Sequence, residues 1–414
     1  MSSSPATLPL RPTTLRAPEG INRLFSAGWD ADWQRHQHRF GPLPELVNQQ
    51  ALLAELTESG LTGRGGAAFA SWKKFSAVLT ATERGGPTVS PVVVGNAAEG
   101  EPLSVKDRAL LRHAPHLVID GLLLAARMLG TSTVYLALGF EEPAVMEALA
   151  SRPDGRSIEV VRIPEQFISG EASALLNFIQ TGRALPRTQS ERLSSSGLRR
   201  RPTLVHNIES LAQFALIARY GGAWFRAVGA PDDPGTRLVS ISDGVRPAFA
   251  VEVPGGAPLA ELLVGQGVEL DSIGAVLLGG YHGSWVSAES LRETSLGGQS
   301  AGAYPAGAGV LWVLRRGQCG LDASAQIMDY LAGQSAKQCG PCRFGLPSAA
   351  EAFHHVVVGD RAALTELQGL LDLLPGRGAC HHPDGSAAFL ASSLNAFSED
   401  LDAHLAGRCL ADAR

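Results

Sequence analysis

Two cysteines separated by two residues stand in the stretch QSAKQCGPCRFG. Cys339 and Cys342 have the spacing of a dithiol that can form a reversible disulfide. The same spacing also binds metal ions and iron–sulfur clusters through thiolates. The pair alone leaves these alternatives open, so other parts of the chain have to distinguish them.

A glycine-rich loop, GRGGAAF, contains Gly63, Gly65 and Gly66. Glycines have no Cβ, so their backbone N–H groups can approach an anion or a flat ring closely. The stretch is neither the dinucleotide fingerprint G-x-G-x-x-G nor a Walker A motif. It therefore indicates a cofactor loop or, as the alternative, a tight turn without a ligand.

Polar side chains follow the apolar stretch PVVV in a second loop, GNAAEGEP. Asn96, Glu99 and Glu101 belong to this loop. Ligands of parallel sheets bind at the carboxyl ends of the strands, where such a loop lies. Solvated loop carboxylates are the alternative.

Two predicted helix starts add further polar groups. SGEASALLN places Gly170 and Glu171 before a helix whose N-terminus favours a phosphate, and VHNIES places Asn207 at another helix start. Together with the two preceding loops, these residues predict one pocket for a flat, polar cofactor that carries a phosphate.

The elements that must position these loops indicate an α/β protein. Residues 45–59 are expected to form a helix that stops at Gly60, and PVVVGNA, PHLVIDGLLLAARMLG and TSTVYLALG are expected to form a strand, a helix and a strand. This order is typical of a largely parallel sheet. From about residue 235 short β-like runs surround one helix, APLAELLV, and after about residue 320 the pattern is helical, with GSAAFLASSLNAFSEDLDAHL expected as one helix.

Composition limits the class of protein. With 414 residues, 45% of them hydrophobic, and a formal net charge of −5, the chain is expected to be globular and not a nucleic-acid-binding protein. Five cysteines are too few for a disulfide scaffold, so a reducing compartment is expected. The N-terminal MSSSPATLPLRPTT lacks the pattern of a signal peptide, and the most apolar helix is short for a membrane span. We expect a soluble, cytoplasmic protein, with docking at the inner face of a membrane through partners left open.

In this order, the motifs resemble the flavin-carrying, NADH-binding subunit of respiratory complex I (the F-type subunits of NADH:quinone oxidoreductase) and its relatives in NAD-dependent hydrogenases and formate dehydrogenases. The resemblance covers about residues 45–395 and rests on GLTGRGGAAF, VVVGNAAEGEPLSVKDRALL, SGEASALLN, RPTLVHNIESLA and CGPCRFG with the later Cys380. It implies a Rossmann-like FMN/NADH domain, a β-grasp (soluble-ligand-binding) domain and a C-terminal helical bundle with a [4Fe-4S] cluster. The expected ranges are an irregular lead-in at 1–44, the α/β domain at 45–232, the β-grasp domain at 233–318 and the iron–sulfur domain at 319–414. In the lead-in, His36 and His38 are expected on a solvated helix face rather than at a metal.

The resemblance also implies a set of site residues and roles. FMN would be bound by Gly63, Arg64, Gly65, Gly66, Lys74, Asn96, Glu99, Gly170, Glu171, His206 and Asn207, with Phe69 and Glu101 on the side of NADH. Glu99 and Glu171 would be the carboxylates at the catalytic centre, and Cys339, Cys342 and Cys380 would ligate the cluster. A flavin needs backbone donors and a cation for its phosphate, and polar groups along its ribityl chain, which fits this set.

The sequence departs from the family at the cluster. The family motif is E-S-C-G-K-C-T-P-C-R, and Ala336 stands here in place of the first cysteine. Three thiolates are fewer than the usual four. An open iron, a borrowed ligand such as His381, Cys319 or Cys409, or the absence of the cluster are the alternatives.

The sequence also departs on the NADH side. Ala98 and Ala172 replace acidic residues of the family loops, and Arg192 stands in place of an aromatic residue. An aromatic stacking surface is worth roughly 1 kcal/mol, although arginine can stack on adenine or pair with a phosphate.

The function that the resemblance implies is an NADH dehydrogenase-type oxidoreductase that passes a hydride from NADH to FMN. Single electrons would then leave through the iron–sulfur cluster to a partner, which would be a ferredoxin-like protein or a [2Fe-2S] subunit. The alternatives are a flavin-containing paralogue with a ferredoxin-like donor and an assembly subunit that has lost its cofactors.

Overall fold

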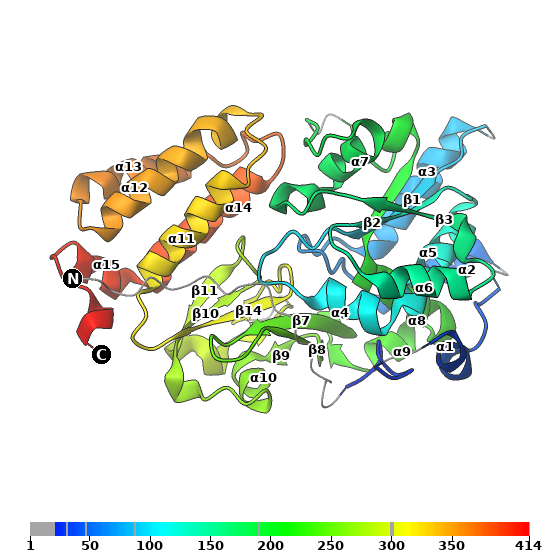
Figure 1. Cartoon of the computed structure of the whole chain (residues 1–414), viewed down its shortest axis with the longest axis horizontal. Helices are drawn as coiled ribbons and strands as arrows, with labels where there is room; N and C mark the ends of the chain where they lie inside the picture. The colour runs from blue at the N-terminus through cyan, green and yellow to red at the C-terminus, as the bar shows by residue number, and fades with distance from the viewer. Residues whose placement is uncertain are drawn as a thin grey trace.

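The computed structural model describes residues 21–29, 32–45, 48–86, 88–188, 191–298 and 302–413. The chain forms three parts, an α/β part, a β-rich part and a helical part (Figure 1). The expectation about the N-terminal MSSSPATLPLRPTT lies outside the described residues.

The α/β part is built on a four-stranded parallel sheet. Its order is β3-β2-β1-β4, with β1 (Val92–Ala97), β2 (Val134–Leu138), β3 (Ile158–Arg162) and β4 (Thr203–Asn207). The register pairs Gly95 of β1 with Leu136 of β2 and with His206 of β4. This Rossmann-like arrangement confirms the predicted fold class, and the carboxyl ends of β1 and β4 lie side by side.

Helices cover both faces of this sheet. On one face, α5 and α8 pack against Val93, Leu136 and Leu204, whereas on the other face α7 packs against Val92 and Val94. The helices of this part are α1 (Trp33–Phe40), α2 (Gln49–Ser59), α3 (Ser71–Gly85), α4 (Lys106–His113), α5 (Pro115–Leu129), α6 (Pro143–Ser151), α7 (Ala172–Thr181), α8 (Ile208–Tyr220) and α9 (Gly222–Arg226).

Local sequence signals explain where several of these helices begin and end. Asn48 and Asn207 accept hydrogen bonds from the first turns of α2 and α8, and Gly60 and Gly130 end α2 and α5 in the left-handed conformation. The predicted ends at Gly60 and Gly130 and the predicted start at Asn207 are confirmed, whereas α2 begins at Gln49, four residues after the start predicted for the helix over residues 45–59. Helix α3 is not among the predicted elements, because SWKKF directly follows the glycine-rich loop, and the structure places Lys74 in its first turn.

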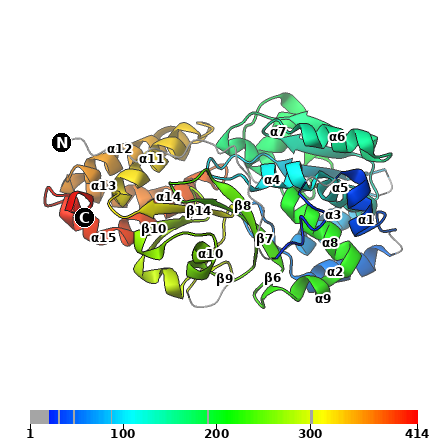
Figure 2. The same cartoon turned by 60° about the horizontal axis from the view of Figure 1, so that its bottom comes forward.

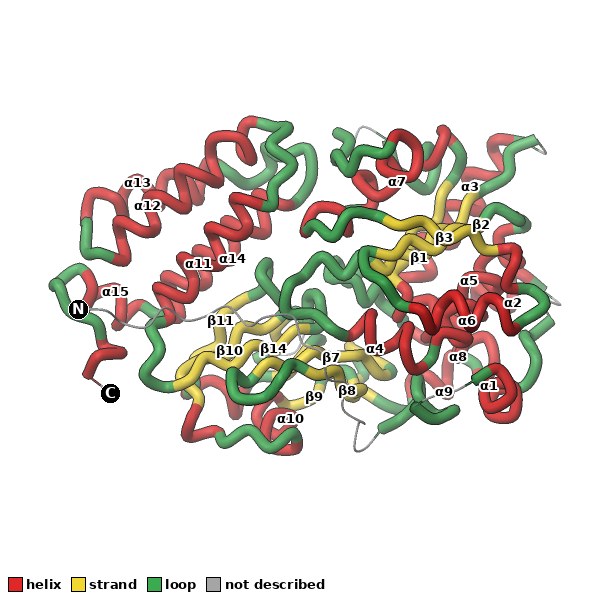
Figure 3. The backbone as a smooth tube through the Cα atoms, viewed as in Figure 1, coloured by secondary structure: helices red, strands yellow, loops and turns green. Residues whose placement is uncertain are grey.

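The β-rich part contains a five-stranded mixed sheet in the order β11-β10-β14-β7-β8 (Figure 3). Its strands are β7 (Thr236–Ser242), β8 (Phe249–Pro254), β10 (Ile273–Leu278), β11 (Ser284–Ser287) and β14 (Val310–Arg315), with β14 parallel to β7. Helix α10 (Leu259–Gly265) packs on one face of this sheet. Shorter strands form two separate small sheets, one of β5 (Gly229–Ala230) and β6 (Asp233–Pro234) and one of β9 (Ala257–Pro258), β12 (Ser295–Leu296) and β13 (Ala303–Tyr304). A mixed sheet with one helix fits the predicted β-grasp module.

The helical part packs on the other face of that sheet (Figure 2). Its helices are α11 (Gly320–Gly333), α12 (Leu346–Val357), α13 (Arg361–Leu373), α14 (His382–Ala396) and α15 (Ser398–His404). The prediction of a single helix over GSAAFLASSLNAFSEDLDAHL is wrong, because the helix breaks at Phe397. The Phe397 ring packs edge-on against Trp285 at 5.2 Å, so burial of this aromatic side chain accompanies the break.

The lead-in also differs from the prediction. Residues 33–40 form α1, and His36 is buried rather than solvated. Its Nε2 lies 2.8 Å from Oδ2 of Asp120, which also pairs with Arg152 and Arg219. The segment is therefore part of the core of the α/β domain.

Among the described residues, no single helix is long and apolar enough to cross a membrane. Helices α4 and α5 are long and apolar enough only when taken together, and a bend of 94° separates them.

Candidate functional site

A cavity of about 440 Å³ lies where the three parts of the chain meet. This volume is in the range of sites for small molecules and cofactors. Its lining comes from the glycine-rich loop, the loop after β1, the starts of α4, α7, α8 and α14, and glycines of the β-rich part. Ten of the sequence-predicted residues line it: Arg64, Gly65, Gly66, Asn96, Glu99, Glu101, Gly170, Glu171, Asn207 and Cys380.

A network of buried charged residues joins the starts of α4 and α8 at one edge of the cavity. Lys106 Nζ lies 2.7 Å from Asp107 Oδ1 and 2.9 Å from Glu209 Oε2. Burial alone would lower the pKa of Lys106, but Asp107 and Glu209 outweigh burial and hold that pKa above its usual value. Asn207 Nδ2 donates to Asp107 Oδ2 at 2.8 Å, so the start of α8 is tied to the start of α4.

Glu99 lies in the loop after β1, and its carboxylate caps the N-terminus of α4. Its Oε1 accepts hydrogen bonds from Ser104 Oγ and from the backbone N–H of Asp107, each at 2.8 Å, and its Oε2 accepts one from the N–H of Arg108 at 3.1 Å. Its φ of +30° is rare for a residue with a side chain, which indicates stored strain. Burial and the nearby Asp107 raise the pKa of Glu99 to about 7. The three accepted bonds favour a positioning role for this carboxylate.

Glu101 presents an unused acceptor to the cavity. Its Oε2 accepts the backbone N–H of Tyr281 at 3.0 Å, while its Oε1 is buried without a hydrogen-bond partner. A Cβ at Gly280 would lie 2.7 Å from this carboxylate, so the glycine leaves room for it. Burial raises the pKa of Glu101 to about 7. A ligand that donates a hydrogen bond would satisfy the orphaned oxygen.

Glu171 and Asn96 connect the loop after β1 to the start of α7. Glu171 Oε2 accepts from Ser173 Oγ at 2.5 Å and from the N–H of Ala174 at 2.8 Å, which caps α7. Asn96 Nδ2 donates to the backbone oxygen of Gly170 at 3.0 Å. These bonds fix the positions of both carboxyl and amide groups at the cavity wall.

Three predicted polar residues have side chains that bond away from the cavity, although Arg64 also belongs to the cavity lining. The guanidinium of Arg64 is buried against Asp233 Oδ1 at 3.3 Å and the backbone oxygens of Pro234 and Thr236, so it joins the α/β part to the β-rich part. Burial lowers the pKa of Arg64 to about 10. Lys74 and His206 are not part of the cavity lining: Lys74 Nζ donates to the oxygen of Val205 at 3.2 Å, and His206 Nε2 is 3.0 Å from Ser71 Oγ.

Gly63 and Phe69 flank the glycine-rich loop without lining the cavity. The N–H of Gly63 donates to the oxygen of Phe69 at 2.9 Å, which closes the loop on itself. The Phe69 ring is half exposed. Gly66, with a φ of +111°, turns the chain at a position that a side chain would strain.

The structure adds cavity residues that the sequence does not predict: Ser104, Lys106, Asp107, Phe167, His282 and His382. The rings of Phe167, His282 and His382 pack together, with centroids 4.8, 5.1 and 5.5 Å apart. Burial, with His382 nearby, lowers the pKa of His282 to about 3, so its imidazole is neutral. The sequence signal that could have identified His282 is its place in a loop with two glycines directly after β10.

Cys342 lies in the helical turn Pro341–Gly345 that leads into α12, and Cys339 lies two residues before that turn. Helix α11 precedes the pair, as expected for a cluster motif rather than a thioredoxin-like site. Burial raises the pKa of Cys339, but N–H groups of Ala379 and Cys342 outweigh burial and lower it overall, which favours the thiolate. Burial raises the pKa of Cys342 to about 12, and it also raises the pKa of Cys380.

Lys337 has a φ of +50° at the position where the family motif has glycine. A positive φ is a conformation that glycine adopts readily, so the local backbone at Lys337 is compatible with the glycine of the family motif, although the first cysteine is Ala336. His381, the alternative fourth ligand, is largely exposed, and its Nδ1 lies 3.0 Å from Asp384 Oδ2.

A second hollow of about 550 Å³ adjoins the cavity and shares Glu171 with it. Ala172, Arg187, Glu191 and Arg192 belong to its lining. The backbone N–H of Arg187 donates to Ser173 Oγ at 2.9 Å, so this segment is attached to the start of α7. Arg192 is exposed at the rim, where its guanidinium is available to an anionic ligand.

Comparisons with protein families match both halves of this site. The Nuo51 FMN-binding domain matches residues 56–215, and the NADH-ubiquinone oxidoreductase-F iron-sulfur binding region matches residues 322–404. The first match contains the loops that line the cavity, and the second contains Cys339, Cys342 and Cys380.

Relatives match over most of the chain. The second of the NADH-quinone oxidoreductase F subunits of Rhizobium meliloti (strain 1021) is 31% identical, over 85% of this chain and 88% of that protein. The NADH-quinone oxidoreductase F subunit of Streptomyces coelicolor (strain ATCC BAA-471 / A3(2) / M145) is 29% identical, over 96% and 93%.

A solved structure is also similar. A chain of the NAD+-reducing [NiFe]-hydrogenase in the H2-reduced state superposes with a TM-score of 0.77 at 28% identity. The superposition covers 86% of this chain and 63% of the hydrogenase chain, so this chain spans less than two thirds of that structure.

The residues fit both groups that these matches imply, with one exception. For FMN, the cavity offers glycine backbone at Gly65 and Gly66, the orphaned Oε1 of Glu101 and two helix starts. For an iron–sulfur cluster, the chain offers three thiols with the right softness, and the fourth ligand position holds Ala336.

The raised pKa of Glu101 predicts a pH dependence of stability in the flavin-free chain. The folded pKa of about 7 lies above the unfolded value near 4.5, so its stabilising contribution is complete below about pH 4.5 and is lost as the pH rises through about 7. Glu101→Gln should therefore reduce the fall in unfolding free energy by about 1 kcal/mol per pH unit between about pH 5 and 7. Urea denaturation at a series of pH values measures this slope. The exposed Glu261→Gln is the control, and an equal slope in Glu101→Gln and wild type would contradict the account.

The position of Ala336 predicts that a single substitution increases cluster loading. Ala336→Cys supplies the missing thiolate next to Lys337, whose positive φ suits the glycine of the motif, so iron and acid-labile sulfide per chain should rise after anaerobic reconstitution. Ser335→Cys is the matched control, because it adds a thiol one residue away. Equal iron content in Ala336→Cys and wild type would show that residue 336 does not face the cluster.

Proposed function

Because the chain belongs to the family of NADH-quinone oxidoreductase F subunits, we propose that it takes electrons from NADH onto FMN and passes them on through an iron–sulfur cluster. One observation supports this most strongly. Cys380 of the cluster motif lines the same cavity as Gly65, Asn96 and Asn207 of the flavin loops. A flavin in the cavity would therefore lie next to a ligand of the cluster.

The two cofactors supply the redox chemistry. When bound, FMN accepts a hydride and releases electrons singly, and an iron–sulfur cluster carries one electron at a time. The chain's own residues bind and orient: the glycine-rich loop offers backbone to the phosphate, and Glu101 Oε1 accepts a hydrogen bond from the ligand. Glu99 and Glu171 hold the loop after β1 and the start of α7 in place. Cys339, Cys342 and Cys380 are the proposed cluster ligands.

The second hollow is the proposed position of the outer part of the dinucleotide. It opens from the cavity past Glu171, and Arg187 and Arg192 supply positive charge for a diphosphate. Arg192 would thereby replace the aromatic surface that the family uses at this position. The loss of two carboxylates at Ala98 and Ala172 reduces repulsion of an anionic substrate.

We further propose a partner protein that accepts the electrons. The relatives are named as subunits, and a similar chain belongs to a hydrogenase that reduces NAD+. A ferredoxin-like protein or a [2Fe-2S] subunit has the chemistry to take single electrons from the cluster.

Anaerobic visible spectroscopy with NADH tests the proposal. The flavin band and the iron–sulfur absorbance should both bleach when NADH is added. Arg192→Ala should raise the KM for NADH about fivefold, equivalent to about 1 kcal/mol, with a smaller change in kcat. Arg183→Ala removes an exposed arginine outside the hollow and is the matched control.

The alternatives give different spectra. If NADH left the flavin band unchanged but reduced ferredoxin bleached it, the electron donor would be a ferredoxin-like protein and not NADH. A colourless protein that releases no flavin on denaturation would contradict the proposal and favour an assembly role.

A further inference from the structure

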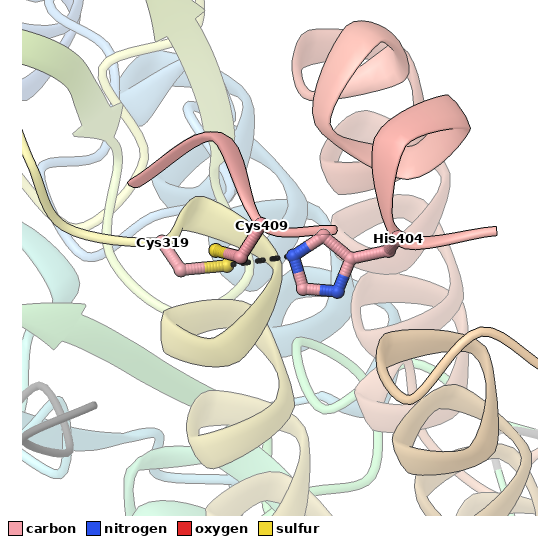
Figure 4. A group of neighbouring side chains, drawn as sticks. All are labelled: Cys319, His404 and Cys409. Carbon is pink, nitrogen blue, oxygen red and sulfur yellow. Dashed lines mark hydrogen bonds between the residues drawn. The ribbon is translucent and has the colours of Figure 1, made fainter. Parts of the chain in front are cut away.

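Three potential metal ligands lie close together where α11 begins and α15 ends (Figure 4). Cys319 Sγ, His404 Nε2 and Cys409 Sγ all lie within 4.8 Å of one another. Within the described part of the chain, this is the only group of three or more histidine, cysteine or carboxylate ligand atoms at such spacing. Cys319 and Cys409 lie outside the matched iron-sulfur binding region, which covers residues 322–404.

The imidazole of His404 is oriented for coordination. Its Nδ1 lies 2.5 Å from the backbone oxygen of Val357, which requires a proton on Nδ1. The lone pair of Nε2 then points toward Cys319 Sγ, 3.5 Å away. A backbone carbonyl that fixes the tautomer in this way is the usual outer partner of a metal-bound histidine. His404 is buried, so its ring is also held by packing.

A defined turn brings Cys409 back to the histidine. After α15, the N–H of Gly407 donates to the oxygen of His404, and the N–H of Arg408 donates to the oxygen of Ala403, both at 2.9 Å. Gly407 has a φ of +75°. This is the hydrogen-bond pattern of a Schellman motif, which reverses the chain. These hydrogen bonds fix the backbone up to the residue before Cys409.

Cys319 is the N-cap residue of α11. Its Sγ accepts a hydrogen bond from the N–H of Asp322 at 3.5 Å, and the helix N-terminus favours a negatively charged ligand there. Cys319 and Cys409 are both partly exposed, so an ion can reach them from solvent. Both are free thiols in this structure.

We propose that Cys319, His404 and Cys409 form a zinc site, separate from the iron–sulfur cluster. Two thiolates and a neutral imidazole balance the charge of Zn2+ and match its preferred ligands, with water or a carboxylate in the fourth position. Tetrahedral coordination at about 2.3 Å places ligand atoms about 3.5–4 Å apart, so the side chains need to move only slightly. Binding displaces the protons of the two thiols.

The site would link three segments of the chain. Cys319 follows the last strand of the β-rich part, His404 ends α15, and Cys409 precedes the C-terminal turn (Figure 4). A bound ion would therefore fix the C-terminal segment to the start of α11. Because the ion would bind the folded chain through these three segments, binding would stabilise the fold.

Equilibrium dialysis against buffered Zn2+ under reducing, anaerobic conditions tests the site in the full chain. Wild type should retain one zinc ion per chain more than Cys409→Ser and more than Cys319→Ser. Serine keeps a helix-capping oxygen at position 319, so the second variant is expected to fold. Zinc should also raise the thermal midpoint of wild type but not of the two variants.

Cys342→Ser is the matched control, since it removes a thiol from the cluster motif and should keep the extra zinc ion. Equal zinc in wild type and Cys409→Ser would overturn the proposal. Loss of the ion in Cys342→Ser alone would also overturn it, because the zinc would then occupy the cluster cysteines. Mass spectrometry of unreduced peptides can detect a disulfide between Cys319 and Cys409. If protein purified without oxidant contained this disulfide, the metal-site proposal would be overturned and the two cysteines would be a redox pair.

Discussion

The buried ammonium of Lys106 is the interaction on which the cavity depends. It pairs with Asp107 in the first turn of α4 and with Glu209 in the first turn of α8, and Glu209 also accepts the N–H of Leu238 from the β-rich part at 2.8 Å. A lone buried charge is costly, and removing one partner of such a group typically costs about 3–5 kcal/mol. The network therefore fixes the relative positions of α4, α8 and β7, and with them the loops that line the cavity.

The three parts of the chain can meet at one site because glycines let the backbone of one part lie close to side chains of another. Gly280 makes room for Glu101, and a Cβ at Gly385 would lie 2.5 Å from the ring of His282. Glycine at these two positions lets side chains from one part pack onto the backbone of another. The flavin loops and Cys380 thus share one cavity wall, and short electron transfer between the proposed cofactors follows from this packing rather than from any single residue.

Much of the architecture could be predicted from the sequence. PVVVGNA, TSTVYLALG, the helix that ends at Gly60 and the helix that begins after Asn207 have strong periodicity and end signals, so their elements can be found from the pattern. Helix α3 escapes prediction because glycines just before it dominate the local pattern. The buried pairing of His36 with Asp120 and the roles of Lys106 and His282 depend on contacts between residues far apart in the chain, which a local pattern does not contain. For the same reason, the turn of Arg64 away from the cavity is visible only in the structure.

The central claim is that FMN binds in the cavity at the glycine-rich loop. A Cβ at Gly65 would already lie 3.2 Å from the Cβ of Asn207, so a leucine there would fill the space that the flavin needs. Titration of the flavin-free chain with FMN, followed by quenching of flavin fluorescence, measures binding directly. The account predicts one FMN per wild-type chain and at least about a hundredfold weaker binding in Gly65→Leu, a loss of about 3 kcal/mol. Equal affinity in the two proteins, at unchanged thermal stability, would place the flavin elsewhere and contradict the account.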